Sequence, residues 1–157
     1  MKLLSEKELT QLVHSISIEF FHKPFVDKVK FNNRLRTTGG RYIPAKRLIE
    51  LNPKYYVEAD QDEFIGIIKH ELCHYHLHIE GKGYKHRDPE FRALLQKTGS
   101  PRHCKPLQSN LNKFNYEYKC TNCHHTYRRV RRVDMKKYRC GICRGRLVEV
   151  KNASLIK

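Results

Sequence analysis

Residues 62–83 of this 157-residue chain read DEFIGIIKHELCHYHLHIEGKG, and this stretch decides the fold. Its first half places apolar side chains nearly all round a predicted helix, at Phe64, Ile65, Ile67, Ile68 and Leu72. A helix with this pattern is buried inside its domain. We expect it to begin at Asp60 or Asp62 and to end at the two glycines, Gly81 and Gly83.

The same helix carries His70 and His74, with Glu71 beside them. At 3.6 residues per turn the two imidazoles project from one face about 6 Å apart along the axis, so both can bind one Zn²⁺ ion. Glu71 is then placed as a general base toward water on that ion. Burying these side chains without partners would be costly, which favours a metal site over a histidine-rich surface helix.

A catalytic zinc site needs a third protein ligand and one open position. His78 lies about 12 Å along the axis from His70, too far for both to bind one ion. The third ligand therefore follows the reversal at the two glycines, where the candidates are His86, Asp88 and Glu90. We choose His86, because Asp88 also has to cap the next helix and Glu90 would face outward on its first turn.

Other polar side chains lie close to these residues in the sequence. We interpret Cys73 as a packed thiol, and His76 and His78 as supporting or surface groups. Four side chains are candidates for stabilising an oxyanion during hydrolysis, and the sequence does not rank them: Tyr75, His76, Tyr84 and Arg87.

The N-terminal region reads as a helix. Ser5 and Glu8 form a capping-box pattern, and apolar residues recur at helical spacing over residues 5–21, before Pro24. The first residues lack the apolar segment of a secretory signal, and no apolar run approaches the ~20 residues of a membrane span. We therefore expect a cytoplasmic protein with no membrane partner, in which cysteine thiols stay reduced.

Short strands are predicted between the two helices. Residues 25–57 read as strands, with a turn at Gly39-Gly40 and a break at Asn52-Pro53. Asp88-Pro89 predicts the start of a further helix, which ends at Gly99. Strands grouped between helices indicate an α+β fold.

Two cysteine pairs lie beyond a change of composition near residues 105–113, where we place a domain boundary. The pairs have C-x-x-C spacing and are 16 residues apart, as in four-cysteine zinc sites: Cys120, Cys123, Cys140 and Cys143. Residues 127–133, 136–139 and 146–150 read as strands. A c-type haem site at the first pair would leave the second unexplained, and nothing thioredoxin-like surrounds either pair. We predict a β zinc ribbon.

Positive charge is concentrated in the C-terminal part. Residues 1–100 hold 17 basic and 13 acidic residues, whereas residues 101–157 hold 15 and 3, which is +12 of the net +16. Such a segment is typical of a polyanion-binding surface, although solubility or a purely structural ribbon are alternatives. We predict that the ribbon binds DNA without sequence preference through Tyr127, Arg128, Arg129, Arg131, Arg132, Lys136, Lys137 and Arg139.

The histidine motif at residues 70–74, followed by His86-Arg87-Asp88-Pro89-Glu90-Phe91, resembles the SprT-like family, which includes the Spartan DNA–protein crosslink proteases. The resemblance extends upstream to Gly39-Gly40 and residues 49–52, and downstream to the zinc ribbon. The animal members carry long tails with ubiquitin- or clamp-binding motifs. We expect no such tail in this protein, so the recruitment that these motifs provide is not carried over from the resemblance.

The resemblance implies two Zn²⁺ ions, one catalytic and one structural. A zincin-like domain over residues 1–108 would hold the first, and a zinc ribbon over residues 113–151 the second. The catalytic zinc ligands would be His70, His74 and His86, with Glu71 as the catalytic residue.

These features lead us to expect a zinc metalloendopeptidase, and the resemblance implies that its substrates are DNA-associated or DNA-crosslinked proteins. A nucleic-acid-binding protein with a non-catalytic zincin scaffold is an alternative. A purely structural site would favour four closed ligands over Glu71 beside an open position, which argues against that alternative. Hydrolysis of a non-peptide amide or ester would use the same residues and stays open.

Overall fold

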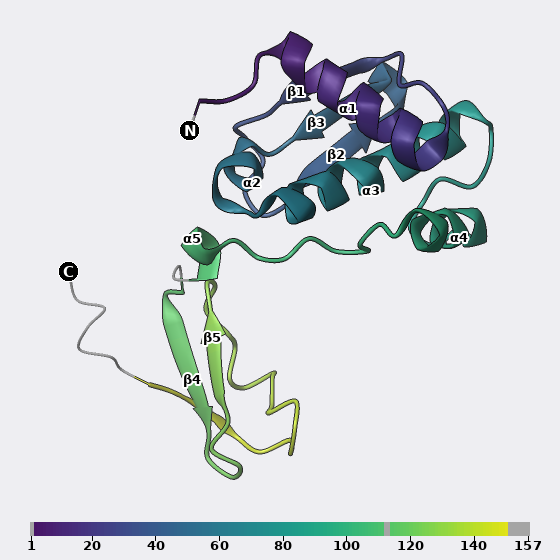
Figure 1. The fold of residues 1–157 in the computed structure, drawn as a ribbon. Coiled ribbons are helices and arrows are strands. Elements are labelled where there is room, and N and C mark those ends of the chain that lie inside the picture. The colour runs from purple at the N-terminus through teal and green to yellow at the C-terminus, as the bar shows by residue number, and fades with distance from the viewer. Residues whose placement is uncertain (1, 112–113, 151–157) are drawn as a thin grey trace. The chain divides into compact units, whose positions relative to one another are not determined.

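The computed structural model describes residues 2–111 and 114–150 (Figure 1). The chain divides into two compact units between Leu107 and Gln108. The first unit holds the histidine motif and the second holds the four paired cysteines, and each is described by itself. None of the helices in the described ranges is long and apolar enough to span a membrane.

The first unit is a small sheet with helices packed against it. Its elements are α1 (Glu6–Phe21), β1 (Lys28–Phe31), β2 (Gly40–Ile43), the 3-10 helix η1 (Pro44–Lys46), β3 (Leu48–Leu51), α2 (Pro53–Glu58), α3 (Gln61–Ile79) and α4 (Pro89–Thr98). The predicted capping box of α1 is confirmed, since Ser5 and Glu8 bond each other reciprocally. Asp60 caps α3, where its Oδ1 accepts the Glu63 N–H at 2.7 Å.

The strand order is β1-β3-β2, with β3 parallel to β1 and antiparallel to β2. The register aligns Val29, Ile49 and Tyr42 in one row that faces the core, because alternate residues of a strand point to opposite faces. α1 lies against β1, α3 lies against β2, and the two helices contact each other (Figure 1). Both helices therefore cover the apolar face of the sheet, with α3 beside the edge strand β2.

α3 is the central helix of this core, as its apolar pattern predicts. Ile68 and Leu72 are fully buried, and Phe64 and Ile67 are 4% and 3% exposed. Burying each such side chain contributes roughly 1.5–3 kcal/mol. This burial sets the rotation of the helix about its axis and directs Glu71 toward β2.

Gly39 and Gly40 do not form the predicted turn. The turn lies at residues 33–34, and Gly40 begins β2. The two glycines instead let β2 approach α3 closely: a Cβ atom at Gly39 would lie 2.6 Å from Ile67 Cδ1, and one at Gly40 would lie 3.1 Å from Glu71 Cγ. Larger residues here would push the edge strand away from the helix.

Asn52 and Pro53 end β3 as predicted, but they also begin α2, which the sequence analysis missed. Asn52 Oδ1 accepts the Lys54 N–H at 3.1 Å, and Pro53 is the first residue of the helix. With six residues, α2 is too short to display a helical period.

Glu50 lies on the face of the sheet away from the core, between Lys30 and Arg41 in the register. Arg41 Nε donates to Glu50 Oε2 at 2.6 Å, Asn32 Nδ2 donates to the same oxygen at 2.9 Å, and Lys30 Nζ lies 3.7 Å from Oε1. Burial by itself would raise the pKa of Glu50. The hydrogen bonds and positive charges outweigh burial, so the pKa is lowered.

We expect Glu50 to make the stability of the first unit depend on pH. Its folded-state pKa lies below that of an unfolded glutamate, about 4.3. Its contribution is therefore complete above that pH and is lost as the pH falls through the folded-state pKa. Thermal unfolding of the wild type and Glu50→Gln between about pH 7 and pH 3 should show a stability difference that shrinks on acidification. A difference that stays constant would contradict this assignment.

The second unit contains α5 (Gln108–Leu111), β4 (Tyr116–Cys120), β5 (Thr126–Arg129) and β6 (Leu147–Glu149). Its sheet has the order β5-β4-β6, and both pairs of strands are antiparallel. The strand predicted over residues 127–133 is shortened to β5, and the one predicted over residues 146–150 is β6.

The strand predicted over residues 136–139 is wrong, because Asp134 starts a turn there. Asp134 Oδ1 accepts the Lys136 N–H at 2.9 Å, and Asp134 O accepts the Lys137 N–H at 3.1 Å. The partner of β5 is β4, which ends at Cys120 of the first cysteine pair and was not predicted as a strand.

Candidate functional site

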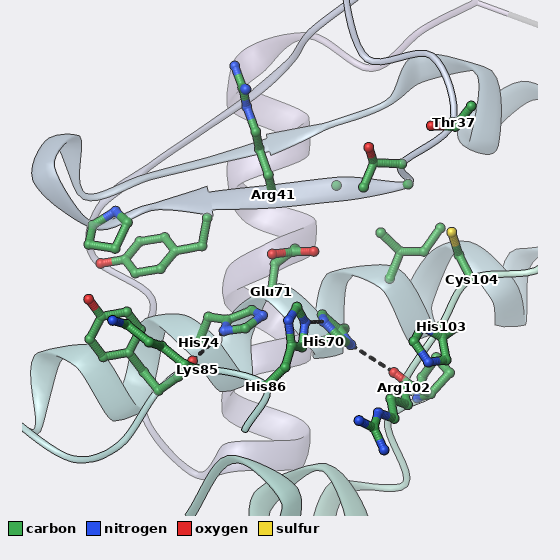
Figure 2. A pocket seen from close by; sticks show the side chains of 18 residues that line it. Thr37, Arg41, His70, Glu71, His74, Lys85, His86, Arg102, His103 and Cys104 are labelled. Atoms are coloured by element: carbon green, nitrogen blue, oxygen red, sulfur yellow. Dashed lines mark hydrogen bonds between the residues drawn. The ribbon is translucent and has the colours of Figure 1, made fainter. Parts of the chain in front are cut away.

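Three histidine side chains converge beside α3 (Figure 2). His70 and His74 extend from α3, and His86 extends from the loop between α3 and α4. One ring nitrogen of each lies within 4.8 Å of the other two, and His70 Nε2 is 3.0 Å from His86 Nε2. Two ring nitrogens on one tetrahedral Zn²⁺ ion are separated by about 3.3 Å. The fold therefore brings the predicted ligands to one point.

Backbone carbonyls determine the orientation of two of these rings. His70 Nδ1 lies 2.8 Å from Pro101 O, and His74 Nδ1 lies 2.5 Å from Tyr84 O. Because a carbonyl oxygen only accepts, each Nδ1 carries the proton and each Nε2 carries a lone pair. Burial lowers the pKa of His74 to about 4 and also lowers that of His70, so both rings are neutral at physiological pH. Neutral imidazoles with a fixed lone pair fit Zn²⁺.

The loop after α3 is closed by local hydrogen bonds that bring His86 back to the helix. Gly81 has a left-handed backbone with φ +68°, and its N–H donates to His78 O at 3.1 Å. Asp88 stands at the N-cap of α4, as predicted, but its side chain accepts the Lys85 N–H at 3.0 Å instead of capping the helix. Asp88 therefore holds the loop and does not point at the histidines as a ligand.

Phe91 in the first turn of α4 packs against all three imidazoles. Its ring is stacked on His74 with the centroids 4.2 Å apart, and it meets His70 and His86 edge-on at 5.4 Å and 5.2 Å. Phe91 is fully buried. It supports the histidine cluster, a role that the sequence analysis did not assign, although its position five residues after His86 was the available signal.

Glu71 is 5% exposed and lies at the wall of the same site. Burial raises its pKa to about 8, while a hydrogen bond from the Tyr42 backbone amide acts in the opposite direction. A carboxyl group with a pKa near neutrality can both accept and return a proton. The edge strand β2 thus contributes directly to the position of the predicted base.

A cavity of about 700 Å³ borders the histidine cluster, between β2, α3 and residues 101–104. Pro101 packs on α3 at Gly66, where a Cβ atom would lie 3.0 Å from Pro101 Cγ, and Lys105 O accepts the Tyr55 O–H at 2.9 Å. These contacts add three side chains to the cavity wall that the sequence analysis missed: Arg102, His103 and Cys104 (Figure 2). No local pattern marks them, since their position depends on anchoring to other segments.

Three of the four candidates for stabilising an oxyanion lie outside the cavity lining that the described residues form. Tyr75 is 2% exposed within the core, and His76 is 5% exposed with its Nε2 2.7 Å from Ser17 Oγ. Neither belongs to the cavity lining formed by the described residues, nor does Arg87, whereas Tyr84 does. Their apolar surroundings explain this placement for the two buried side chains, because a helix buried on most faces also buries its polar members.

His78 and Cys73 are held by partners away from the cluster. His78 Nδ1 lies 2.7 Å from the Tyr42 hydroxyl oxygen. Cys73 is a fully buried thiol, as predicted, with its Sγ 3.8 Å from the hydroxyl oxygens of Thr98 and Ser100.

The paired cysteines of the second unit also converge. Their four sulfur atoms lie within 4.8 Å of one another, with Cys120 Sγ 3.4 Å from Cys143 Sγ and Cys123 Sγ 3.6 Å from Cys140 Sγ. A Cβ atom at Gly145 would lie 2.8 Å from Cys120 Sγ, so the second cysteine turn needs glycine at this position. Four sulfur ligands without an open position fit a structural Zn²⁺ site.

The residues predicted to contact DNA lie in this unit, and all except Tyr127 are exposed. The Tyr127 hydroxyl lies 3.2 Å from Cys140 Sγ and accepts the Gly141 N–H at 3.0 Å. The hydrogen bond from Tyr127 lowers the pKa of Cys140 to about 5. Tyr127 thus stabilises a thiolate. Arg128 and Arg132 lie 3.5 Å and 3.6 Å from ribbon carboxylates, and the other basic side chains extend from the same unit.

Comparison with known proteins matches both units. The model of the SprT-like family matches residues 9–116, and that of the SprT-like zinc ribbon domain matches residues 114–151. Protein SprT-like of Oceanobacillus iheyensis is 63% identical over 96% of this chain and 100% of its own length. The proteins of the same name from Geobacillus kaustophilus and Bacillus subtilis are 56% and 52% identical, over 92% and 94% of this chain and 98% and 99% of their own.

One solved structure also aligns with the chain. It is the metallopeptidase zymogen abylysin of Pyrococcus abyssi, which matches 60% of this chain and 83% of its own, with a TM-score of 0.46 and 17% identity.

The predicted fold class is confirmed by the two family models together with the architecture. The first unit is an α+β domain that the SprT-like family model matches, and the second is a small β zinc ribbon with four cysteines. The family model covers more than half of the chain, and the relatives match nearly all of it. The chain therefore belongs to the SprT-like family.

Proposed function

We propose that this protein is a zinc metalloendopeptidase that acts on DNA-associated or DNA-crosslinked proteins. The observation that carries the proposal is the convergence of three imidazoles beside a buried carboxyl group at the wall of a cavity. Zn²⁺ bound by His70, His74 and His86 would supply Lewis-acid polarisation of a carbonyl and activation of water. A second Zn²⁺ ion bound by the four paired cysteines would be structural.

Glu71 is the general base in this proposal. It accepts the proton of the attacking water and returns it to the nitrogen of the leaving amine. The Tyr42 backbone amide holds its carboxylate, and the carbonyls of Pro101 and Tyr84 hold two of the imidazoles. Because these groups are already in position, little reorganisation is needed during the reaction.

The edge strand β2 at the wall of the cavity also suits the binding of a polypeptide. Within the described residues, β2 pairs with β3 alone, and residues 39–42 line the cavity. An extended peptide adds to such a strand edge through backbone hydrogen bonds. This supports cleavage within a polypeptide over hydrolysis of a small amide or ester.

The test is incubation of zinc-loaded protein with a DNA-bound protein and with free casein, each with and without DNA. Cleavage of casein supports the peptidase, and faster cleavage of the DNA-bound protein supports the substrate class. If protein that contains zinc at both sites cleaves neither, the peptidase proposal is overturned.

His86→Ala is expected to weaken zinc binding at the histidine site by about 100-fold or more, because it removes a direct ligand. His78→Ala is the matched control and should retain the ion, since His78 bonds Tyr42 and lies outside the cluster. Zinc content after dialysis against a weak chelator, measured by atomic emission, distinguishes the two variants. Equal loss of zinc from both would contradict the assignment of the third ligand.

The basic ribbon is proposed to bring the peptidase to DNA. Arg131 and Lys136 are exposed, so Arg131→Glu/Lys136→Glu should weaken DNA binding and lower the slope of log K against log salt by about 2, or about 0.9 for each phosphate contact. The charge-conserving pair Arg131→Lys/Lys136→Arg should bind nearly as well as the wild type. Fluorescence anisotropy with a labelled oligonucleotide measures both, and an unchanged slope in the glutamate variant would remove these residues from the interface.

A further inference from the structure

The face of the first sheet that points away from α1 and α3 is built differently from the core face. By the register, Lys30 of β1, Glu50 of β3 and Arg41 of β2 form one row across this face. Lys28, Leu48 and Ile43 form the adjacent row. The two helices that contact the sheet pack on the opposite side, where Val29 and Ile49 belong to the core cluster and Leu48 does not. We call the face that carries these two rows, on the side of the sheet away from α1 and α3, the outer face.

The outer face and the loops that continue it carry an unbalanced positive charge. Residues 28–47 include seven basic residues and no acidic residue, whereas the rest of residues 1–100 include 10 basic and 13 acidic residues. The net positive charge of the first hundred residues therefore comes entirely from this segment. The seven basic residues are Lys28, Lys30, Arg34, Arg36, Arg41, Lys46 and Arg47.

Two carboxylates next to this segment are already neutralised. Glu50 accepts from Arg41 at 2.6 Å and lies 3.7 Å from Lys30, and Asp27 Oδ2 accepts from Arg47 Nε at 2.8 Å. Lys28, Arg34 and Lys46 are exposed and form no ion pair within the part of the chain that the structure describes. Their charges are available to an external anion.

We propose that the outer face binds the phosphate backbone of a nucleic acid. Lys28 and Lys30 are about 6.6 Å apart along β1, and Lys30 and Arg41 are about 9.6 Å apart across three strands. Cations repeated over these distances suit a ligand whose charge also repeats along its length. Between residues 19 and 56 of the described chain, Val26 is the one large apolar side chain that is exposed, so the face lacks the apolar area that a membrane surface requires.

The outer face and the cavity share the edge strand β2. β2 forms one edge of the sheet, and its residues 40–42 line the cavity. Figure 2 shows Arg41 extending from β2 away from the histidine cluster. Nucleic acid on the outer face is thus separated from the cavity by a single strand. The inference depends on the charge of this face and not on peptidase chemistry or on the ribbon.

The test compares two pairs of charge reversals in the full chain. Lys28→Glu/Lys46→Glu changes Lys28 of the outer face and Lys46 of the adjoining helix η1 without removing the partners of Glu50. Lys7→Glu/Lys97→Glu makes the same change in net charge at exposed positions of α1 and α4. The probes are fluorescein-labelled single-stranded and double-stranded DNA of mixed sequence, titrated at several salt concentrations. The first pair should weaken binding about tenfold or more and lower the salt slope by about 2, and the second less than about threefold.

Further measurements distinguish nucleic-acid binding by the outer face from an effect of bulk charge and from the peptidase proposal. Equal weakening by both pairs of substitutions would assign the effect to bulk charge and overturn the inference, as would tighter binding of polyglutamate than of DNA. Lys28→Gln/Lys46→Gln should show a smaller loss in the same direction if charge is the cause; retention of wild-type affinity would contradict it. Loss of DNA binding by the Lys28 and Lys46 variants with casein cleavage unchanged supports the surface, whereas failure of the wild type to cleave casein bears on the peptidase alone.

Discussion

Glu71→Gln is expected to lower kcat for peptide cleavage by about 10³-fold or more while the zinc content stays unchanged, because general-base catalysis contributes up to about 10⁴-fold. Glutamine has the shape of glutamate and can still accept the Tyr42 amide hydrogen bond. It cannot take a proton from water. The loss should therefore appear in kcat, with KM nearly unchanged, since no ground-state contact with the substrate is removed.

Glu80→Gln, at the C-cap of the same helix, is the matched control. Glu80 pairs with Lys23 and Lys82 on the surface and does not line the cavity. It should change kcat less than about twofold, as surface substitutions usually do. Wild-type cleavage by Glu71→Gln would overturn the role of Glu71 as base. Loss of zinc from Glu71→Gln would instead indicate that the side chain maintains the site and does not act as the base.

Cys140→Ser is expected to unfold the ribbon and leave the first unit folded. The buried cluster of the second unit is small, and two of its three buried members, Cys120 and Cys140, belong to the sulfur set. The partly buried members include Cys143 as well. Zinc binding contributes about 10–16 kcal/mol to the folding of comparable small zinc modules, and so small a core cannot replace that contribution.

Cys104→Ser is the matched control, because Cys104 lies outside the sulfur cluster in the first unit. Zinc content should fall by one ion in Cys140→Ser and stay unchanged in Cys104→Ser. In amide NMR spectra of the full chain, the signals of the second unit should collapse to unfolded positions while those of the first unit persist. A ribbon that keeps its dispersed signals without the Cys140 thiol would show that zinc does not hold it together.

The candidate metal sites were accessible to sequence reasoning because their spacing is local. His70 and His74 share one helix face through the period of 3.6 residues, and each cysteine pair spans one tight turn. His86 could be predicted as the third ligand because Gly81 and Gly83 indicate where the chain reverses after the helix. The same local logic explains the correct capping box at Ser5 and the buried helix α3.

Local logic also explains the errors. The strand predicted over residues 136–139 has the composition of a strand, but the Asp134 side chain bonds the following amides and forms a turn. Gly39 and Gly40 have the composition of a turn, yet in the structure they allow β2 to pack closely against α3. In both cases a contact between particular atoms sets the local structure, and the amino-acid composition of the segment does not reveal that contact.

By itself, the sequence determined that this chain has a histidine motif on a buried helix, a later histidine within reach and a four-cysteine module. Only the tertiary structure decided which tautomer His70 adopts, which strand amide holds Glu71 and which face of the sheet carries the excess positive charge. The Pro101 carbonyl that orients His70 is 31 residues away, and Arg41 meets Glu50 through strand register. Such contacts join distant segments, so the packing of the whole unit sets them and no local period predicts them.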